Sequence, residues 1–232
     1  VMPMTFGRYV GNISSRFDST ELMGQLASVP RWLDAGEVLP LSEGHDQVLK
    51  ADLVIGGKIV SVAIKVFGRQ SFFKDWFDRR NQSKAARSYN AGEFLYRQEL
   101  GTAEPIAWLD RWDNGRLVES YYLCIHVAAP CFRDALIQIY EQEQNNDGMM
   151  ALLYEVAPAL RQLHEAGFMH GDLGNQNILV PKSSSGAYLA PLFIDLNRSQ
   201  YPSAPLGDRE RAHDLARICL LYTSDAADEE DS

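Results

Sequence analysis

The sequence has few cysteines, no long hydrophobic run and no secretion signal. Its three cysteines, Cys124, Cys131 and Cys219, form no Cys-x-x-Cys pair and are odd in number, a pattern that favours a reduced, cytoplasmic protein. No apolar stretch approaches the length of about 20 residues that a transmembrane helix requires, and no basic region followed by an apolar core opens the chain. Neither membrane insertion nor secretion is therefore indicated.

Several catalytic motifs are also missing. The chain has no G-x-S-x-G and no G-x-x-x-x-G-K-[ST], and His164-Glu165 is followed by Phe168 where a zinc protease helix would carry its second histidine. These absences argue against serine hydrolases of that type, P-loop proteins and zinc proteases. With 46% hydrophobic and 23% charged residues, the chain has the composition of a folded globular protein with one large domain or two lobes.

One pattern in the second half of the chain carries the residues of a reaction centre. His170, Asp172 and Asn177 form His-x-Asp-x-x-x-x-Asn, and Asp195 ends a hydrophobic stretch over 189–194. Transfer of a phosphoryl group needs positioning and charge neutralisation more than covalent chemistry, so a carboxylate near the acceptor hydroxyl and an Asp–Asn pair that binds Mg²⁺ would suffice. The pattern predicts Asp172 as the catalytic base and Asn177 and Asp195 as metal ligands.

The residues around this pattern support it. An apolar helical periodicity precedes it and stops before Gly167, and a short strand over 178–180 follows the loop. The polar turn 182–186 then leads into a second strand, which predicts a hairpin that carries Asp195 back to Asn177. In the alternative interpretation these Asp and Asn side chains only order a loop, which explains less of the surrounding pattern.

The first half contains a candidate lysine for binding ATP. Two β-rich stretches, 48–55 and 58–67, flank Gly56-Gly57, a strong signal for a hairpin turn. The second stretch contains Val62-Ala-Ile-Lys65, which matches the setting of the kinase lysine that binds the α and β phosphates. Lys65 is therefore predicted to bind phosphate, although an isolated strand lysine is more often a solvated surface residue.

A carboxylate partner for this lysine is expected on the following helix, over 83–100. Glu93 shares an aromatic stripe with Tyr89 and Tyr96, a face expected to point into the protein, where an unpaired charge would be costly. Glu99 is the competing candidate, but it falls in the last helical turn, at the unfavourable end of the helix dipole. Glu93 is thus the predicted partner of the lysine.

The remaining nucleotide contacts are less well defined by the sequence. The turn 42–46 has Gly44 as its one glycine and no G-x-G-x-x-G, so a phosphate contact and an ordinary surface turn both remain open. The segment 126–130 is expected to be a hinge whose backbone binds adenine through His126 and Val127. A plain linker between lobes is the alternative interpretation.

These elements define four segments. Residues 1–36 are expected to form a lead-in with one short helix over 20–27, residues 37–127 a lobe of antiparallel strands with one helix, and residues 128–218 a mostly helical, incomplete lobe. Residues 219–229 resemble the conceptual translation of a sequencing adapter, so residues 219–232 are expected to be an artefactual tail. The tail carries five acidic and no basic residues, and without it the net charge changes from −9 to −4, so the acidity of the chain indicates no particular partner.

Together these motifs resemble the protein-kinase-like superfamily, and in particular the bacterial lipopolysaccharide core kinases, the Kdo and heptose kinases. The resemblance implies an α+β, bilobal fold in which the N-lobe is an antiparallel sheet with one helix and the C-lobe is mostly helical. It covers roughly residues 37–218 and rests on these segments: Val62-Ala-Ile-Lys65, the helix 83–100 with Glu93, Gly101-Thr-Ala-Glu-Pro-Ile-Ala107, His170-Gly-Asp-Leu173, Asn177-Ile-Leu179, Ile194-Asp-Leu-Asn-Arg198 and Arg211-Ala-His-Asp-Leu-Ala-Arg217.

The resemblance also implies a reaction. ATP and Mg²⁺ would be the cofactors, Lys65 held by Glu93 would bind phosphate, and the acceptor would be a hydroxyl of a lipopolysaccharide core sugar, Kdo or heptose. Asp172 would take or orient the acceptor proton. His170 would orient the catalytic loop and Asp214 would brace it from a following helix, and neither would be the chemical base.

The segment after Asp195 departs from protein kinases. Leu196-Asn197 replaces Phe-Gly, and the helical pattern that begins near Asp208 leaves too little chain for an activation segment and a peptide platform. A sugar or glycolipid acceptor is therefore expected, with a cytoplasmic enzyme that can associate peripherally with the inner membrane and has no nucleic acid partner. A small-molecule kinase of the aminoglycoside or choline phosphotransferase type and a non-catalytic nucleotide-binding pseudokinase remain as alternatives.

Overall fold

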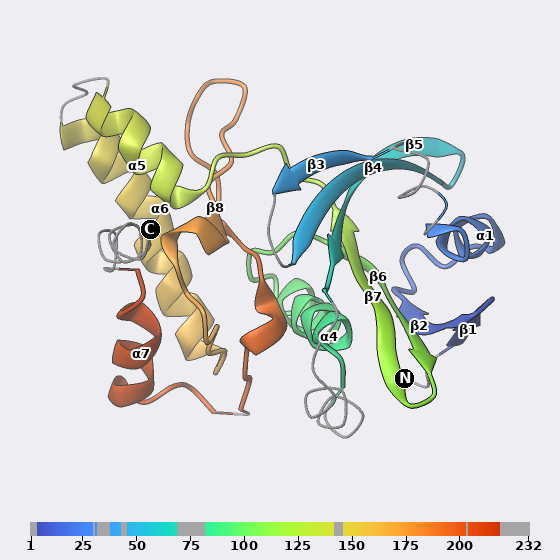
Figure 1. Ribbon diagram of the computed structural model, residues 1–232. Coiled ribbons are helices and arrows are strands. Elements are labelled where there is room, and N and C mark those ends of the chain that lie inside the picture. Colours follow the sequence, from blue (N-terminus) through green and yellow to red (C-terminus); the bar gives the residue numbers. More distant parts are fainter. Residues whose placement is uncertain are drawn as a thin grey trace, which may run out of the picture. The chain divides into compact units, whose positions relative to one another are not determined.

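The computed structural model describes residues 4–29, 31, 38–42, 46–68, 82–141, 146–202 and 204–218. The chain forms two compact units (Figure 1): unit 1 comprises Val1–Glu93 and Ala103–His126, and unit 2 comprises Phe94–Thr102 and Val127–Ser232. The chain passes from unit 1 to unit 2 within helix α4 (Lys84–Arg97), returns after Thr102 and leaves unit 1 again after His126.

Unit 1 is built on an antiparallel sheet. In the described ranges the sheet has seven strands in the order β1-β2-β6-β7-β5-β4-β3, and every neighbouring pair is antiparallel. The strands are β1 (Met4–Phe6), β2 (Tyr9–Ile13), β3 (Leu39–Ser42), β4 (Gln47–Ile55), β5 (Lys58–Val66), β6 (Pro105–Asp113) and β7 (Arg116–Ile125). The turn between β4 and β5 is Gly56-Gly57, where both residues have positive φ, so the predicted hairpin is confirmed.

The segment predicted as a lead-in contributes two strands to this sheet. β2 alternates buried and more exposed residues, as a strand with one face against a core does, and pairs with β6 from Val10–Asp110 to Ile13–Ala107. β1 and β2 are short, which is why their period-two pattern was too weak to predict. Helix α1 (Thr20–Leu26) lies where the sequence predicted it, and its first turn is capped by Ser19, whose side chain accepts a hydrogen bond from the Leu22 N–H at 3.1 Å.

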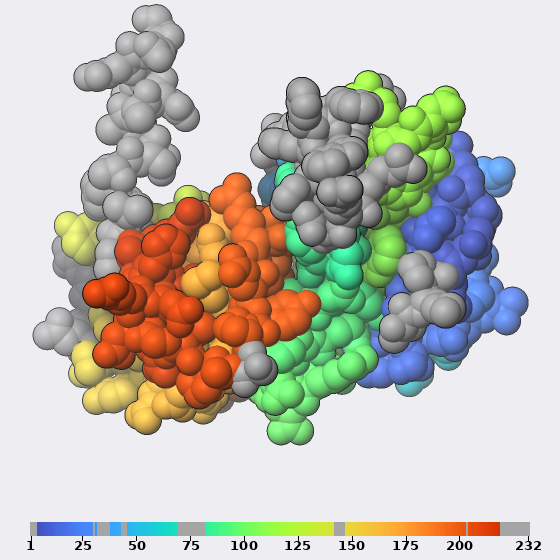
Figure 2. All heavy atoms as spheres, turned by 90° about the horizontal axis from the view of Figure 1, so that it is seen from below, coloured from blue at the N-terminus to red at the C-terminus, as the bar shows by residue number. Residues whose placement is uncertain are grey.

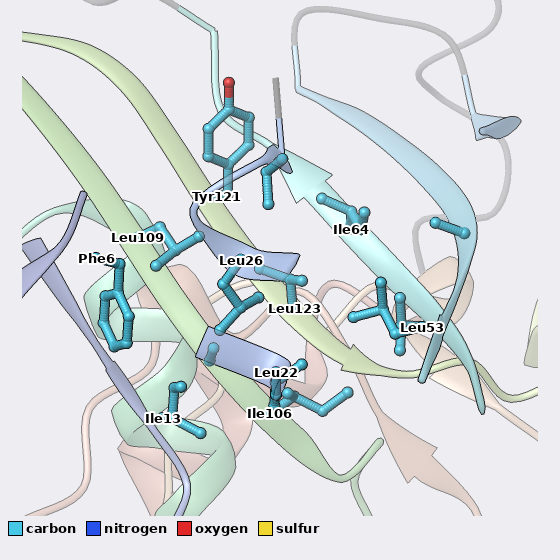
Figure 3. Packing of buried hydrophobic residues seen from close by; sticks show 14 of the residues in the cluster. Phe6, Ile13, Leu22, Leu26, Leu53, Ile64, Ile106, Leu109, Tyr121 and Leu123 are labelled. Atoms are coloured by element: carbon cyan, nitrogen blue, oxygen red, sulfur yellow. The ribbon is translucent and has the colours of Figure 1, made fainter. Parts of the chain in front are cut away.

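The main core of unit 1 lies between α1 and one face of the sheet (Figure 3). Leu22 and Leu26 of α1 are fully buried there. The strand residues labelled with them are Phe6, Ile13, Leu53, Ile64, Ile106, Leu109, Tyr121 and Leu123. Burial of each such side chain contributes about 1.5–3 kcal/mol, so this cluster is the principal source of stability in unit 1.

Helix α4 packs on the opposite face of the same sheet. Tyr122 of β7 faces away from its neighbours Tyr121 and Leu123 and joins a second cluster with Phe67, Ala85 and Tyr89. Gly92 permits this packing, because a Cβ atom there would lie 3.1 Å from the Tyr122 hydroxyl. The helix thus lies against the sheet face that carries Tyr122 and its cross-strand neighbour Lys65.

Unit 2 is mostly helical. The loop that contains His170 is followed by a two-stranded ladder. Ile178 pairs with Phe193 in this ladder, which confirms the second predicted hairpin. The segments after β9 that the structure describes, coloured orange to red, lie together on one surface of this unit (Figure 2). The elements are α5 (Phe132–Glu141), α6 (Asn146–Glu165), η1 (Asn175–Asn177), β8 (Ile178–Leu179), β9 (Leu192–Phe193), η2 (Leu196–Arg198) and α7 (Asp208–Leu215).

Three stacked aromatic rings fix the chain beside the His170 loop. Tyr201 stacks on Phe94 with a centroid separation of 4.9 Å and on Phe168 at 5.9 Å. Next to this stack, Met169 and Gln200 exchange backbone hydrogen bonds of 2.8 and 2.9 Å. The segment that follows η2 is therefore anchored directly before His170. No helix in the described part of the chain is both long and apolar enough to cross a bilayer.

Candidate active site

The loop from His170 to Asn177 depends on a glycine between its histidine and its aspartate. Gly171 has φ +74°, and a Cβ atom at this position would lie 2.5 Å from the backbone oxygen of Arg198. A larger residue would therefore be strained in its backbone and would also collide with the segment after β9. The sequence His-Gly-Asp follows from this close approach.

Asn177 links Asp172 to the end of the hairpin. Its side-chain Nδ2 donates to the backbone oxygen of Asp172 at 2.9 Å, and its own backbone oxygen accepts from the Ile194 N–H at 3.0 Å. Ile194 directly precedes Asp195, so the structure brings the two predicted metal ligands to the same end of the β8–β9 ladder. Asn177 is buried, and its donor group is already satisfied by Asp172.

Asp195 has an unusual backbone conformation. Its φ and ψ are 61° and 52°, in the left-handed region, which costs a non-glycine residue about 1–2 kcal/mol. Its Oδ1 accepts a hydrogen bond of 2.5 Å from Asn197 Nδ2. Strained conformations of this kind are found where a side chain must point in a fixed direction. One carboxylate and one amide oxygen are ligands that Mg²⁺ accepts when nucleotide phosphates and water complete the shell, so these residues fit the ion.

His170 connects the two halves of the site. Its Nε2 lies 2.9 Å from the Ile194 backbone oxygen, and its Nδ1 lies 3.3 Å from the Asp172 N–H nitrogen. Burial lowers the pKa of His170, against the opposing effects of Asp214, Asp195 and Asp172, so the ring is neutral at pH 7. A neutral ring satisfies both contacts in one tautomer, in which Nε2–H donates to Ile194 and Nδ1 accepts from Asp172.

Asp214 of α7 holds the backbone of the same loop. Its Oδ2 accepts from the His170 N–H at 3.0 Å and its Oδ1 from the Gly171 N–H at 2.8 Å. A third bond of 3.0 Å comes from His164 Nε2 on α6, in a fully buried contact. Burial by itself would raise the pKa of Asp214, but these hydrogen bonds outweigh it and lower the pKa below the usual value. The carboxylate is therefore charged where it contacts the loop.

Sequence reasoning missed His164 in this role. It lies at the end of a helix and is separated from Asp214 by 50 positions, with no motif that joins the two.

Sequence reasoning also missed two arginines that contact Asp172, the predicted base. Asp172 Oδ1 pairs with Arg217 Nη1, and its Oδ2 lies 3.2 Å from Arg198 Nη1.

Lys65 lies in β5 directly opposite Tyr122, on the sheet face that α4 covers. Its Nζ is 5.4 Å from the centre of the Phe67 ring. On the same ring lies Lys84, whose Nζ also donates to Asp46 at 2.9 Å. Burial alone would raise the pKa of Asp46, but the bond from Lys84 and the charges of Lys84 and Lys65 outweigh it and lower the pKa. Asp46, at the end of the predicted phosphate turn, is thus a further charged residue beside Lys65.

Glu93 has a partner that the sequence did not predict. Arg16, in the turn after β2, donates to both of its carboxylate oxygens, at 2.6 and 3.2 Å, and binds Glu104 at 2.7 Å as well. Glu93 is 7% exposed, so the arginine neutralises a buried charge. The predicted contact between Glu93 and Lys65 stays a prediction, supported by the position of both residues around Tyr122.

The predicted adenine contacts have simple backbone surroundings. The N–H of His126 donates to the Ser61 oxygen at 3.0 Å, and the Val127 oxygen accepts from the Ala129 N–H at 3.1 Å. Binding of adenine by this backbone stays a prediction. Gly44, the predicted phosphate-loop glycine, lies outside the described residues.

Comparison with known proteins decides the family. The model of the lipopolysaccharide kinase (Kdo/WaaP) family matches residues 69–230. The chain belongs to this family. A solved structure of WaaP in complex with acyl carrier protein is similar in fold, with 18% identity, a TM-score of 0.61, and coverage of 90% of this chain and 79% of that one. No curated protein sequence matches the chain.

Membership of the Kdo/WaaP family confirms the resemblance seen in the motifs. The protein is a kinase, a phosphotransferase that acts on hydroxyl groups, with the α+β, kinase-like bilobal fold predicted from the sequence. Within the family match lie all the predicted residues of unit 2: Val127, His170, Asp172, Asn177, Asp195 and Asp214.

Proposed function

We propose that this lipopolysaccharide kinase transfers the γ-phosphate of ATP to a hydroxyl of a core sugar, Kdo or heptose. The observation that carries the proposal is the position of Asn177, which is bonded to Asp172 through its side chain and to Ile194 through its backbone. These bonds support the proposal, because they would keep a base and a metal-binding pair close together, as phosphoryl transfer needs.

Each residue of this arrangement has a defined part. Asp172 accepts the proton of the acceptor hydroxyl. The hydroxyl oxygen forms a bond to the γ-phosphorus of ATP, while the bond between this phosphorus and the ADP oxygen breaks. Asn177 and Asp195 would hold Mg²⁺, which would neutralise charge on the phosphate oxygens. His170 and Asp214 keep the loop in place through the hydrogen bonds described above.

The nucleotide is bound mainly by residues of unit 1. Lys65 binds the α and β phosphates, with Glu93 and Asp46 as the nearby carboxylates, and the backbone at His126 and Val127 binds adenine.

The length of chain after Asp195 supports a small acceptor. Helix α7 already begins at Asp208, and the intervening residues are tied to the catalytic loop through Gln200 and Arg198. A peptide-binding platform of the protein-kinase type does not fit into this segment. A sugar on a glycolipid does, and it places the enzyme at the cytoplasmic face of the inner membrane, in peripheral contact with its substrate and without a nucleic acid partner.

A substitution at Asp172 tests the reaction. Asp172→Asn should lower ATP-dependent phosphorylation of lipopolysaccharide core oligosaccharide by about 10²–10⁴-fold, because the carboxylate is the base. Asp134→Asn, at an exposed carboxylate on α5, is the matched control and should keep the wild-type rate. Wild-type turnover in Asp172→Asn would refute the assignment.

Two outcomes of the same assay identify the alternatives. Phosphorylation of an aminoglycoside or choline in place of the oligosaccharide would assign a different small-molecule kinase, since His170-Gly-Asp-Leu173 occurs in that type as well. Binding of ATP without turnover on any acceptor would assign a pseudokinase.

A further inference from the structure

Two arginines flank the carboxylate of Asp172, one on each oxygen. Arg217 Nη1 pairs with Oδ1, and Arg198 Nη1 lies 3.2 Å from Oδ2. All three residues belong to unit 2. In the described part of the chain Asp172 is the only acidic partner of either arginine.

The two arginines share the single carboxylate of Asp172, and the carboxylates of Asp195 and Asp214 also act on this loop. The side chains of Arg198 and Arg217 are 60% and 41% exposed, against 27% for Asp172. A guanidinium carries five N–H donors, and each arginine uses only one nitrogen on Asp172. Guanidinium donors that face solvent in this way can bind an anion.

The same contacts hinder Asp172 as a base. Because each oxygen of the carboxylate is already shared with an arginine, a hydroxyl that approaches Asp172 competes with a guanidinium donor. An anion that takes over guanidinium donors would remove this competition. Carboxylates and phosphates are suited to this exchange because their paired oxygens match the planar guanidinium fork.

We propose that Arg198 and Arg217 form an anion-binding subsite for the acceptor. The subsite binds a carboxylate or phosphate group of the acceptor next to the hydroxyl that reacts, and in doing so releases Asp172. The acceptor is therefore an anionic sugar, not a neutral one. This inference rests on the proposed role of Asp172 as the base.

The γ-phosphate of ATP is the competing ligand for these arginines. The two possibilities differ in the substrate whose KM changes: loss of an acceptor subsite raises the KM of the acceptor, and loss of a contact to the γ-phosphate raises the KM or lowers the kcat of ATP turnover with every acceptor.

The test uses the full chain and the variants Arg198→Gln and Arg217→Gln, which keep size and polarity but remove the charge. Arg161→Gln is the matched control, because Arg161 on α6 is 75% exposed and pairs with Glu165. The acceptors are lipopolysaccharide core oligosaccharide, the same material with its carboxyl groups reduced, and the same material with its phosphates removed. Circular dichroism melting curves check that each variant is folded.

Each arginine variant should raise the KM of the intact oligosaccharide about tenfold or more and leave the KM of ATP within about twofold. One of the two neutralised oligosaccharides should show this raised KM with the wild type, and on it the variants should have no further effect. Which neutralised oligosaccharide does so identifies the group as carboxylate or phosphate.

Three results would overturn the subsite: a rise in the KM of ATP alone, an equal loss on charged and neutralised acceptors, or no change. Calorimetric titration of the oligosaccharide keeps the test independent of turnover. Arginine-dependent binding without phosphorylation would leave the subsite standing and remove the proposed function. If both variants phosphorylate the oligosaccharide as the wild type does, the proposed function stands and the subsite is refuted.

Discussion

Arg16 donates hydrogen bonds to both carboxylate oxygens of Glu93, at 2.6 and 3.2 Å, across 77 positions of the sequence. The same guanidinium also binds the Glu104 side chain and the Pro105 backbone oxygen, so one arginine joins the turn after β2, helix α4 and the start of β6. Glu93 is nearly buried, and its charge requires this partner.

Replacement of Arg16 tests whether this contact positions Glu93. Arg16→Ala should lower the free energy of unfolding by about 3 kcal/mol, since a buried carboxylate loses its cation. It should also raise the KM of ATP several-fold if Glu93 in turn positions Lys65. Steady-state kinetics and urea unfolding measure the two effects, and Arg16→Lys, which cannot form the bidentate contact, should fall between Arg16→Ala and the wild type.

The control for this experiment is Arg8→Ala. Arg8 lies in the same N-terminal segment and pairs with Glu119, but its side chain is 58% exposed, so its removal should cost less than about 1 kcal/mol. Equal effects of the two substitutions would contradict a special role for Arg16.

Gly171→Ala should be more harmful than Gly186→Ala. Both glycines have positive φ, so an alanine costs about 1–2 kcal/mol at either position, but only at Gly171 would the new Cβ meet a backbone oxygen, that of Arg198, at 2.5 Å. Thermal unfolding should show the additional loss, and kcat should fall more than about tenfold because Asp172 is the next residue. Matching losses of stability in the two variants would show that the loop yields to the contact.

Asp214→Asn should destabilise unit 2 and impair catalysis. The amide keeps one oxygen acceptor, so its NH₂ group would face the backbone N–H of either His170 or Gly171, and the loss of charged hydrogen bonds in a buried site should cost about 3 kcal/mol. Asp208→Asn, at an exposed position of the same helix, is the control. A kcat in Asp214→Asn equal to that of the control would argue that the loop holds its shape without this carboxylate.

Stability should fall as the pH drops below the usual pKa of histidine. The pKa of His170 is lowered by burial in the folded protein, so between that value and the ordinary value of 6.5 the unfolded chain binds more protons than the folded one. The stabilisation is complete above pH 6.5 and is lost on acidification, by at most about 1.4 kcal/mol per pH unit. Urea unfolding from pH 7.5 to 5.5 should show a shallower dependence for His170→Gln, and parallel curves would remove His170 as the cause.

Local chemistry allowed much of the fold to be predicted. The Gly56-Gly57 turn and the β8–β9 hairpin follow from turn residues and apolar strands that are adjacent in sequence. Asp172, Asn177 and Asp195 could be proposed because the helix, turn and strand patterns around them support their spacing, and their roles stay predictions.

The unpredicted contacts depend on tertiary packing. Arg16 finds Glu93 only because a weakly patterned hairpin adds two strands to the edge of the sheet. Arg198 reaches Asp172 because Asp195 turns the chain through a left-handed conformation, and no residue pattern encodes that turn. The sequence around Arg16 and Arg198 does not distinguish them from the other arginines, so their charge alone could not identify their partners.

The attachment of Arg16 to Glu93 also changes where the first lobe must start. A protein that begins at the expected boundary, residue 37, would lack Arg16, the cation that neutralises Glu93 of α4. It would also lack the two edge strands, β1 and β2, that precede Arg16. The catalytic unit is thus longer than its motifs suggest, and an expression fragment designed from the motifs alone would leave the buried carboxylate of Glu93 without its counterion.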